Sequence, residues 1–278
     1  MPDRPLRLLI VGAHPDDADY AAGGTAALYR AHGHVVRMVS LTNGDAGHHE
    51  RPGPELAKRR LAEATAAGAI IGADYELFDN HDGELLPTLE NRAQVIRLIR
   101  SFDPDLVLTH RPNDYHPDHR YTSQLVQDAA YMVTVPAVVP GVRHLAKNPV
   151  IAYLPDNFQK PCPLEPAIAV DVSPVLDKIV SMLCCHVSQF FEWLPFNFGV
   201  LHEVPAGEAQ RRGWLQELLC ARLRQQAERF RKLLLLQYGG ERGSRIEYAE
   251  AFEGCEYGSP LDAAARKRLF EFVPYAER

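Results

Sequence analysis

The sequence predicts an α/β fold in which a doubly wound, mainly parallel sheet carries helices on both faces. Short, continuously apolar runs such as Leu8–Val11 fit strands that are buried on both faces. Helical patterns separate these runs, and strands that alternate with helices are typical of parallel sheets. The chain has 278 residues, of which 46% are hydrophobic and 24% charged, so it is long enough to bury a substantial core.

The elements expected in the first 135 residues each have a local reason. The strand at 8–11 leads through a loop at 12–19 to a helix that Gly33 closes as a C-terminal cap. The Ala-rich stretch 55–72 carries its charges on one side, as an amphipathic helix does. We expect strands at 8–11, 34–41, 75–78 and 105–109, and helices at 20–32, 55–72, 91–101 and 116–135.

After about residue 136 the pattern loosens, and Pro-rich stretches separate the expected elements. We expect strands at 150–154 and 168–171, and helices at 175–190 and 206–238, the second ending at Gly239-Gly240. No internal repeat or domain boundary stands out. We therefore expect a single domain over 1–278, with a core part at 1–135 and a part at 136–278 that packs over the sheet and shapes the pocket.

Charge and cysteine content limit the classes of partner and compartment. The formal net charge is −6 and no polybasic surface is evident, so we expect neither a nucleic-acid partner nor membrane insertion. No signal-peptide core is present. Five irregularly spaced cysteines do not form a disulfide framework, and an odd number fits a reducing compartment. We expect a cytoplasmic protein whose oligomeric state is open, with a homo-oligomer as one alternative.

Two acidic-histidine clusters carry the chemistry: His14-Pro15-Asp16-Asp17 and, about a hundred residues later, His116-Pro117-Asp118-His119. Each follows an expected strand, and parallel sheets bind ligands outside the carboxyl ends of their strands. A catalytic zinc ion takes three His or Asp/Glu ligands and leaves one position for water. His14, Asp17 and His119 meet that requirement, and the pKa of the bound water would fall to about 7.

The other residues of the clusters suit the remaining steps of hydrolysis. Asp16 lies next to a ligand and can accept the proton of the water as general base. His116 stands one helical turn before His119; if Asp118 orients and charges it, His116 becomes an electrophile for the oxyanion or an acid for the leaving amine. Alone, the first cluster is as typical of a turn with an Asp N-cap as of a metal site, and the second is more typical of a solvated helix start. Together they favour a metal site that cleaves an amide.

The same residues resemble the PIG-L/LmbE-like family of zinc-dependent N-deacetylases. The resemblance extends over most of the chain and includes these further pieces: Gly23-Gly24-Thr25, Asn43-Gly44-Asp45, Arg60-x-x-Glu63-Ala64, His186-x-Ser188-Gln189 and Tyr248-Ala249-Glu250-Ala251-Phe252. It implies a Rossmann-like fold and removal of an acetyl group from an N-acetylglucosamine-type sugar or its conjugate. It also implies one Zn²⁺ per chain, with another divalent metal as an alternative.

By position, the resemblance assigns His14, Asp17 and His119 as zinc ligands, Asp16 as general base, and His116 with Asp118 as the oxyanion and charge-relay pair. It places Asp45, Arg60 and Asp82 near the positions that hold the sugar. The family usually has Glu where this chain has Asp19, a residue that is not a ligand in this scheme.

Several interpretations stay open. An amidase that cleaves a larger acyl group from a thiol–sugar conjugate would use the same chemistry, and a non-catalytic sugar- or nucleotide-binding module would hold only a structural metal. His186, Ser188 and Gln189 either support the metal loop or satisfy a helix end. Five basic residues of the late helix form either a solvated face or the border of an interface: Arg222, Arg224, Arg229, Arg231 and Lys232.

Overall fold

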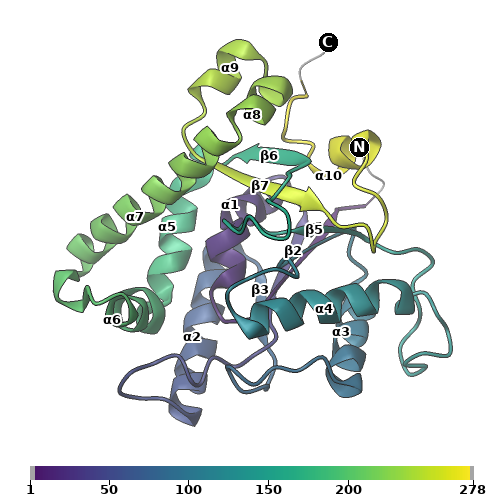
Figure 1. The fold of residues 1–278 in the computed structure, drawn as a ribbon, viewed down its shortest axis with the longest axis horizontal. Coiled ribbons are helices and arrows are strands. Elements are labelled where there is room, and N and C mark those ends of the chain that lie inside the picture. The colour runs from purple at the N-terminus through teal and green to yellow at the C-terminus, as the bar shows by residue number, and fades with distance from the viewer. Residues whose placement is uncertain (1–3, 276–278) are drawn as a thin grey trace.

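This computed structural model describes residues 4–275 of the chain. They fold around a seven-stranded sheet (Figure 1). The strands are β1 (Arg7–Gly12), β2 (Val35–Ser40), β3 (Asp74–Leu77), β4 (Leu106–Thr109), β5 (Val150–Tyr153), β6 (Ile168–Asp171) and β7 (Ala249–Gly254). They lie in the order β3-β2-β1-β4-β5-β7-β6. All neighbours from β3 to β5 are parallel, whereas β7 is antiparallel to both β5 and β6. The predicted mainly parallel sheet is confirmed.

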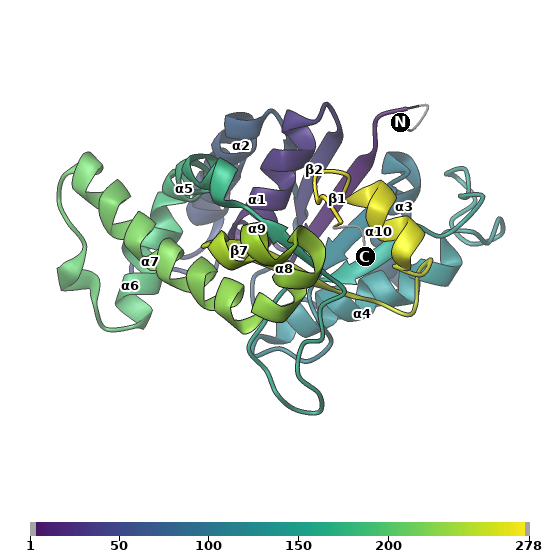
Figure 2. The ribbon, with the colours of Figure 1, turned by 90° about the horizontal axis from the view of Figure 1, so that it is seen from above.

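Helices connect the strands and follow them. The α-helices are α1 (Asp17–Ala31), α2 (Pro54–Ile71), α3 (Leu89–Phe102), α4 (Pro117–Met132), α5 (Leu176–Cys185), α6 (Leu194–Asn197), α7 (Glu208–Arg229), α8 (Arg231–Tyr238), α9 (Gly240–Arg245) and α10 (Ala263–Leu269). Two 3₁₀ turns at Ser173–Val175 and Leu201–Glu203 and a π-helical turn at Ser188–Trp193 complete the regular structure. Figure 2 shows α3 and α4 on one side of the molecule and α5, α6 and α7 on the other.

Strand β1 is buried on both faces because its side chains alternate between two apolar clusters. Leu8 and Ile10 belong to the cluster that includes residues of α1, α5, α7 and α8. Leu9 and Val11 point the other way, into the cluster built with α3 and α4. A strand with helices on both sides has no polar face, which explains why its sequence is continuously apolar. The expected helices on both faces are confirmed.

The site-bearing edge of the sheet lies where β1 and β4 end side by side. Val11 is in register with Thr109, and both strands run the same way. The segments that follow them therefore emerge at one edge. The strand order also reverses between β1 and β4, because β1 leads to β2 on one side while β4 leads to β5 on the other. Such a switch point leaves a crevice for ligands.

The C-terminal part is tied to α1 through Glu250 of β7. Its carboxylate accepts hydrogen bonds from the backbone N–H groups of Gly24 and Thr25, both at 2.8 Å, and from the Thr25 hydroxyl at 2.7 Å. Gly24 allows this contact, because a Cβ there would lie 2.4 Å from Cγ1 of Val172. The Gly23-Gly24-Thr25 motif thus contacts the Tyr248–Phe252 motif, and together they form the junction between α1 and β7.

Three expectations about the C-terminal part need correction. The helix expected at 206–238 is wrong in its middle: Phe230, with φ −108° and ψ 23°, separates α7 from α8, and neither Gly nor Pro marks the break. The helix expected at 175–190 ends at Cys185 and gives way to the π-helical turn. Strand β7 was not expected at all. Among residues 4–275, no helix combines the length and apolarity needed to cross a bilayer.

Candidate metal centre

The three expected metal ligands come together at the edge where β1 and β4 end. Nδ1 of His14 lies 3.2 Å from Nε2 of His119 and 3.6 Å from Oδ2 of Asp17. Nε2 of His119 lies 3.5 Å from Oδ1 of Asp17. In a tetrahedral zinc site, bonds of about 2.0–2.1 Å place the ligand atoms about 3.3 Å apart. The side chains thus already converge at ligand spacing.

Asp17 is fixed by the start of α1. Its Oδ2 accepts hydrogen bonds from the backbone N–H groups of Ala13 at 2.8 Å and His14 at 2.7 Å, which leaves Oδ1 toward His119. A side chain on Gly12 would prevent this, because a Cβ there would lie 2.6 Å from Cβ of Asp17. Burial raises the pKa of Asp17, but His119 and His110 outweigh it and hold that pKa well below its usual range.

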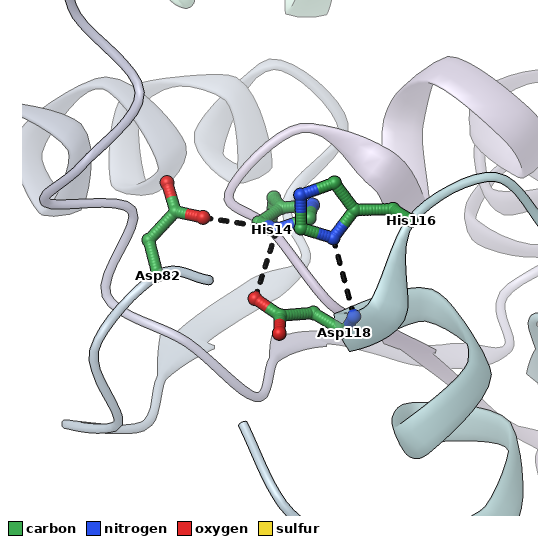
Figure 3. Close-up of side chains that lie close together, drawn as sticks. All are labelled: His14, Asp82, His116 and Asp118. Atoms are coloured by element: carbon green, nitrogen blue, oxygen red, sulfur yellow. Dashed lines mark hydrogen bonds and ion pairs between the residues drawn. The ribbon is translucent and has the colours of Figure 1, made fainter. Parts of the chain in front are cut away.

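Each ligand imidazole uses one nitrogen for the centre and presents the other to a carboxylate. Nε2 of His14 lies 3.2 Å from Oδ1 of Asp82 and 3.3 Å from Oδ2 of Asp118. Figure 3 shows these two carboxylates converging on the ring of His14. Nδ1 of His119 lies 3.0 Å from Oδ1 of Asp114. A carboxylate behind a ligating imidazole fixes its tautomer and increases its basicity, as is common in metal sites.

The donor set fits a divalent cation such as zinc. Burial lowers the pKa of His14, but hydrogen bonds to Asp118, Asp17 and Asp82 outweigh it and raise that pKa well above its ordinary value. Asp16 adds another buried carboxylate, and its Oδ1 has no hydrogen-bond partner among the described residues. Carboxylates gathered in a buried site need a positive partner. Two imidazoles and one carboxylate at ligand spacing are a zinc-type set.

Asp16 lies beside the centre and faces the cavity described below. Burial, followed by the charge of Asp17, raises the pKa of Asp16 to about 6. A carboxylate with a pKa near neutrality is a better proton acceptor than an ordinary aspartate. The position and protonation of Asp16 therefore match those of a general base.

A buried network supports the loop from behind, which decides between the two interpretations of His186. Nε2 of His186 lies 2.6 Å from Oδ2 of Asp19, and the Tyr75 hydroxyl donates to Oδ1 of Asp19 at 3.3 Å. Asp19 and His186 are fully buried. His186 therefore supports the start of α1, which carries Asp17. Asp19 makes this contact although its side chain is one methylene shorter than that of a glutamate.

The expected ion pair between Asp118 and His116 does not form in the described chain. The carboxylate of Asp118 accepts hydrogen bonds from the backbone N–H groups of Gly83 at 2.7 Å and Leu85 at 3.3 Å, and it contacts His14. Nδ1 of His116 accepts instead from the backbone N–H of Asp118, at 3.2 Å, so the ring caps α4 (Figure 3). The Asp118 carboxylate is fully buried and lies near His116 without bonding to it.

The three expected sugar-binding residues lie beside the centre but do not line the cavity. The Asp45 carboxylate contacts Nδ1 of His81 at 2.7 Å and accepts the backbone N–H of Asp82 at 3.0 Å. Arg60 is almost fully buried and donates to the Gly47 carbonyl at 2.7 Å and to Gln189. Asp82 contacts His14. In this structure, all three mainly stabilise loops around the centre.

Sequence reasoning missed two residues of the centre, His110 and Asp114. Nε2 of His110 lies 3.1 Å from Oδ2 of Asp17, and its ring stacks on that of His119 with 3.9 Å between the centroids. Burial, followed by the charge of His119, lowers the pKa of His110. The position of His110 directly after β4 was a signal, because ligand-binding residues gather at strand ends.

A cavity of about 560 Å³ opens beside the centre. Asp16, Asp17 and His119 line one part of its wall, and residues of α7, including Arg222 and Arg229, line another. Helix α7, from the later part of the chain, thus lies at this cavity. Two of the five basic residues of the late helix therefore face a cavity rather than only solvent. A volume of this size is typical of small-molecule sites.

The fold and the site together define a Rossmann-like α/β protein with a His–Asp–His candidate metal centre beside a small-molecule pocket. A family model described as PIG-L, GlcNAc-PI de-N-acetylase, matches residues 9–130, which contain all the candidate ligands. Residues 9–130 of the chain thus match the PIG-L family, in agreement with the resemblance found in the sequence motifs.

Curated relatives of this chain fall into two activity classes. It is 28% identical over 193 residues to a 4-oxalmesaconate hydratase of Pseudomonas putida, covering 66% of this chain and 74% of the relative. It is 28% identical over 254 residues to a 1D-myo-inositol 2-acetamido-2-deoxy-alpha-D-glucopyranoside deacetylase of Actinosynnema mirum, covering 74% and 88%. The relatives of this chain therefore include both deacetylases and a hydratase.

Among solved structures, the N,N'-diacetylchitobiose deacetylase of Pyrococcus horikoshii superposes with a TM-score of 0.70. The superposition covers 90% of this chain and 84% of that one, at 21% sequence identity. At this identity the likeness establishes the shared fold.

Proposed function

We propose that this protein is a zinc-dependent hydrolase that removes the acetyl group from an N-acetylated amino sugar of the N-acetylglucosamine type, or from its conjugate. The observation that carries the proposal is the convergence of His14, Asp17 and His119 at ligand spacing, beside a buried Asp16 that faces a cavity. The sugar deacetylase from Actinosynnema mirum, similar over 74% of this chain, supports the substrate class.

The chain's own groups have separable roles in this reaction. His14, Asp17 and His119 hold the zinc ion, which when bound would lower the pKa of a water molecule and polarise the acetamide carbonyl. Asp16 accepts a proton from the attacking water. The water oxygen bonds to the carbonyl carbon, the C–N bond breaks, and acetate and a free amine leave. The amine takes up the proton that Asp16 received.

We assign His116 as a neutral hydrogen-bond donor to the developing oxyanion. Its Nδ1 accepts the backbone N–H of Asp118, so the ring proton resides on Nε2. Burial, followed by the charges of His14 and His119, lowers the pKa of His116, which favours the neutral ring near pH 7. We assign to Asp118 the role of orienting the His14 ring. We assign to Asp45, Arg60 and Asp82 the role of stabilising the loops around the centre on the side where the sugar binds.

Acetate release tests this proposal. Purified protein should contain about one zinc ion per chain, release acetate from members of a panel of N-acetylated sugars, and lose this activity with a chelator. The Asp16→Asn variant should keep its metal but lose about two to four orders of magnitude in kcat, because it cannot accept the proton. Asp128→Asn serves as the matched control, because Asp128 is a half-buried residue of α4 that does not line the cavity. Full activity in Asp16→Asn would refute the mechanism.

A second candidate is hydration of a carbon–carbon double bond in an unsaturated carboxylate. It is favoured by the similarity to the Pseudomonas putida hydratase over 66% of this chain. Adding unsaturated carboxylates to the panel distinguishes the two, since hydration removes the ultraviolet absorbance of a conjugated double bond and releases no acetate. Amides with longer acyl chains in the panel test the amidase alternative.

We also propose that the chain forms one domain and works in the cytoplasm. Strands β6 and β7 of the later part complete the sheet begun by the first, which supports a single domain. All five cysteines are free, consistent with a reducing compartment.

A further inference from the structure

We propose that the α7 wall of the cavity is a subsite for an anionic group of the substrate, a carboxylate or a phosphate, bound by Arg222 and Arg229. This inference rests on the proposed function for the reacting acetamide, and it adds the chemical class of the substituent attached to the sugar.

Arg222 and Arg229 share one face of α7. They are seven residues apart, which is about two helical turns, so their side chains leave the helix on the same side. Gln225 and Gln226 lie between them, and all four line the cavity. Oε1 of Gln226 is buried and has no hydrogen-bond partner among residues 4–275. This face is polar where it meets the cavity.

Neither arginine is neutralised by a carboxylate of the described chain. Arg222 donates to the Tyr20 carbonyl at 2.6 Å. Arg229 donates to the Asp156 carbonyl at 2.6 Å and to Oδ1 of Asn157 at 3.2 Å. Arg111, the third arginine of the cavity, differs: it pairs with the Asp156 carboxylate at 3.1 Å and lies 3.6 Å from that of Glu253.

Both guanidinium groups are held in place without using all their donors. Arg222 lies over the Tyr20 ring, 3.9 Å from its centroid, and Arg229 lies 4.8 Å from the centroid of Phe230. A guanidinium has five N–H groups, so each keeps several for a ligand. Planar, pre-oriented guanidinium groups bind carboxylates and phosphates in a bidentate way. Two of them at one wall suit an anion better than a neutral sugar.

The position of α7 determines how far this subsite lies from the metal centre. The Tyr20 carbonyl that accepts from Arg222 lies one helical turn after Asp16, whose carbonyl accepts the Tyr20 N–H at 2.9 Å. One turn of α-helix rises about 5.4 Å, comparable with the span of a sugar ring. A substituent across the ring from the acetamide, or on its neighbouring carbon, therefore reaches α7 while the acetamide lies at the metal centre.

The acidic groups of the cavity do not cancel this charge. Asp17 and Asp114 face the imidazoles of His14, His110 and His119. The Asp156 carboxylate faces Arg111. Asp16 forms no ion pair with Arg222 or Arg229, and Glu250, which does not line the cavity, has its oxygens occupied by Gly24 and Thr25. The cavity is thus polarised, with ligand-type residues at one wall and unpaired cations at another.

Binding to a variant without turnover tests the subsite separately from catalysis. The probes are the carboxymethyl glycoside of N-acetylglucosamine, its neutral carbamoylmethyl isostere, and N-acetylglucosamine 1-phosphate. Their affinities for zinc-loaded Asp16→Asn protein are measured by titration calorimetry. We expect at least one anionic probe to bind about tenfold or more tightly than the neutral one, because a charge-assisted pair is lost with the amide. The two anionic probes show whether carboxylate or phosphate is preferred.

Arginine variants in the same background locate the effect. Arg222→Gln and Arg229→Gln should each bring the affinity for the preferred anion close to that for the neutral probe, and Arg222→Lys should restore part of it. Arg224→Gln is the matched control: it removes one charge from α7, but Arg224 is exposed, contacts Tyr248 and does not line the cavity. It should leave the preference unchanged. Thermal unfolding of each variant confirms that the fold is retained.

The outcomes separate this inference from the proposed function. Equal affinities for charged and neutral probes, no binding of either anion at millimolar concentration, or a preference that survives both glutamine variants would each overturn the subsite. If the preference is present but the wild-type protein releases no acetate from any probe, the subsite stands and the deacetylase proposal fails. If the neutral probe is deacetylated without any charge preference, the reverse holds.

Discussion

A carboxylate lies behind each imidazole of the candidate metal centre. Asp114 backs His119 at 3.0 Å, and Asp82 and Asp118 back His14 at 3.2 and 3.3 Å. These contacts leave Nδ1 of His14 and Nε2 of His119 for the ion. A residue that touches neither metal nor substrate can therefore still control the affinity of the site.

Asp114→Asn should weaken zinc binding about 10- to 100-fold while leaving the fold intact, because the amide has nearly the same shape but cannot support His119 as a negative partner. Zinc competition with a fluorescent chelator measures the dissociation constant. Asp128→Asn, at a half-buried position of α4 outside the centre, is the control and should bind zinc as the wild type does. An unchanged constant in Asp114→Asn would show that the contact with His119 has no role in binding.

The candidate ligands could be predicted from the sequence, whereas their supporting residues could not. His14, Asp17 and His119 belong to two motifs that each follow a strand, and strand ends meet at the edge of a parallel sheet. The contact of Asp118 with His14 could not be predicted, because the direction of a side chain in the first turn of a helix depends on tertiary contacts. Arg222 and Arg229 gave no signal, since five basic residues decorate that stretch.

At the scale of elements, helix α1 is the piece that every part of the site depends on. Its start carries Asp17, its first turn contacts α7 through Tyr20, and its middle packs on Val172 and on β7 through Gly24. The close approach at Gly24 positions the helix against the C-terminal part. Any side chain there must move α1 or the strands.

Gly24→Ala should lower the free energy of unfolding by about 1–3 kcal/mol, because overpacking outweighs the better helix propensity of alanine. Its Cβ would lie 2.4 Å from Cγ1 of Val172 and 2.9 Å from Oε1 of Glu250. Gly213→Ala in α7 is the matched control: no atom lies within 4 Å of that Cβ, so stability should rise by up to about 1 kcal/mol. Urea unfolding measures both. A gain in both variants would mean that the junction is not tightly packed.

Glu192 connects the π-helical turn to α2 and to the loop before it. Its carboxylate forms two hydrogen bonds with Arg59, at 2.6 and 2.8 Å, and lies 2.8 Å from Nε2 of His48. The bonds to Arg59 lower the pKa of Glu192 to about 2, from 4.5. A folded-state pKa below the unfolded one contributes stability above about pH 4.5 that is lost as the pH falls toward 2.

Glu192→Gln should therefore reduce the free energy of unfolding at pH 7, by about 1 kcal/mol or less because the pair is partly exposed. Urea titrations from pH 7 to pH 3 measure the difference from wild type. That difference should be constant above about pH 5 and shrink below about pH 4.5, where the wild-type carboxylate begins to take up protons. A difference that does not depend on pH would assign the loss to packing instead of charge.

Elements with a local signal were predicted, and those stabilised by distant partners were not. Strands β1 and β4 contain the continuous apolar runs Leu8–Val11 and Leu106–Leu108, so their burial is visible in the sequence. Strand β7 carries Glu250 and Glu253, and its place in the sheet follows from pairing with β5 and β6. The break at Phe230 has no local marker either, because α8 turns to pack beside β6.

At the scale of the whole molecule, the candidate centre joins two segments that are about a hundred residues apart in the chain. His14 and Asp17 follow β1, whereas His119 is on α4. An unfolded chain does not hold these groups together, so an ion that binds them binds only the folded state and stabilises it by mass action. The buried carboxylates increase this effect, because their mutual repulsion is relieved when the cation binds.

Zinc added to chelator-treated protein should therefore raise the free energy of unfolding by about 2.7 kcal/mol when free zinc is about one hundred times the dissociation constant. Urea unfolding with and without zinc measures the shift. His119→Ala should abolish it, whereas His202→Ala, which removes an exposed histidine outside the site, should retain it in full. Magnesium, which prefers oxygen ligands in octahedral geometry, should stabilise the wild type much less. If zinc raised the free energy of unfolding of His119→Ala as much as that of the wild type, the ion would bind elsewhere. The place where the two segments meet would then not be the metal site.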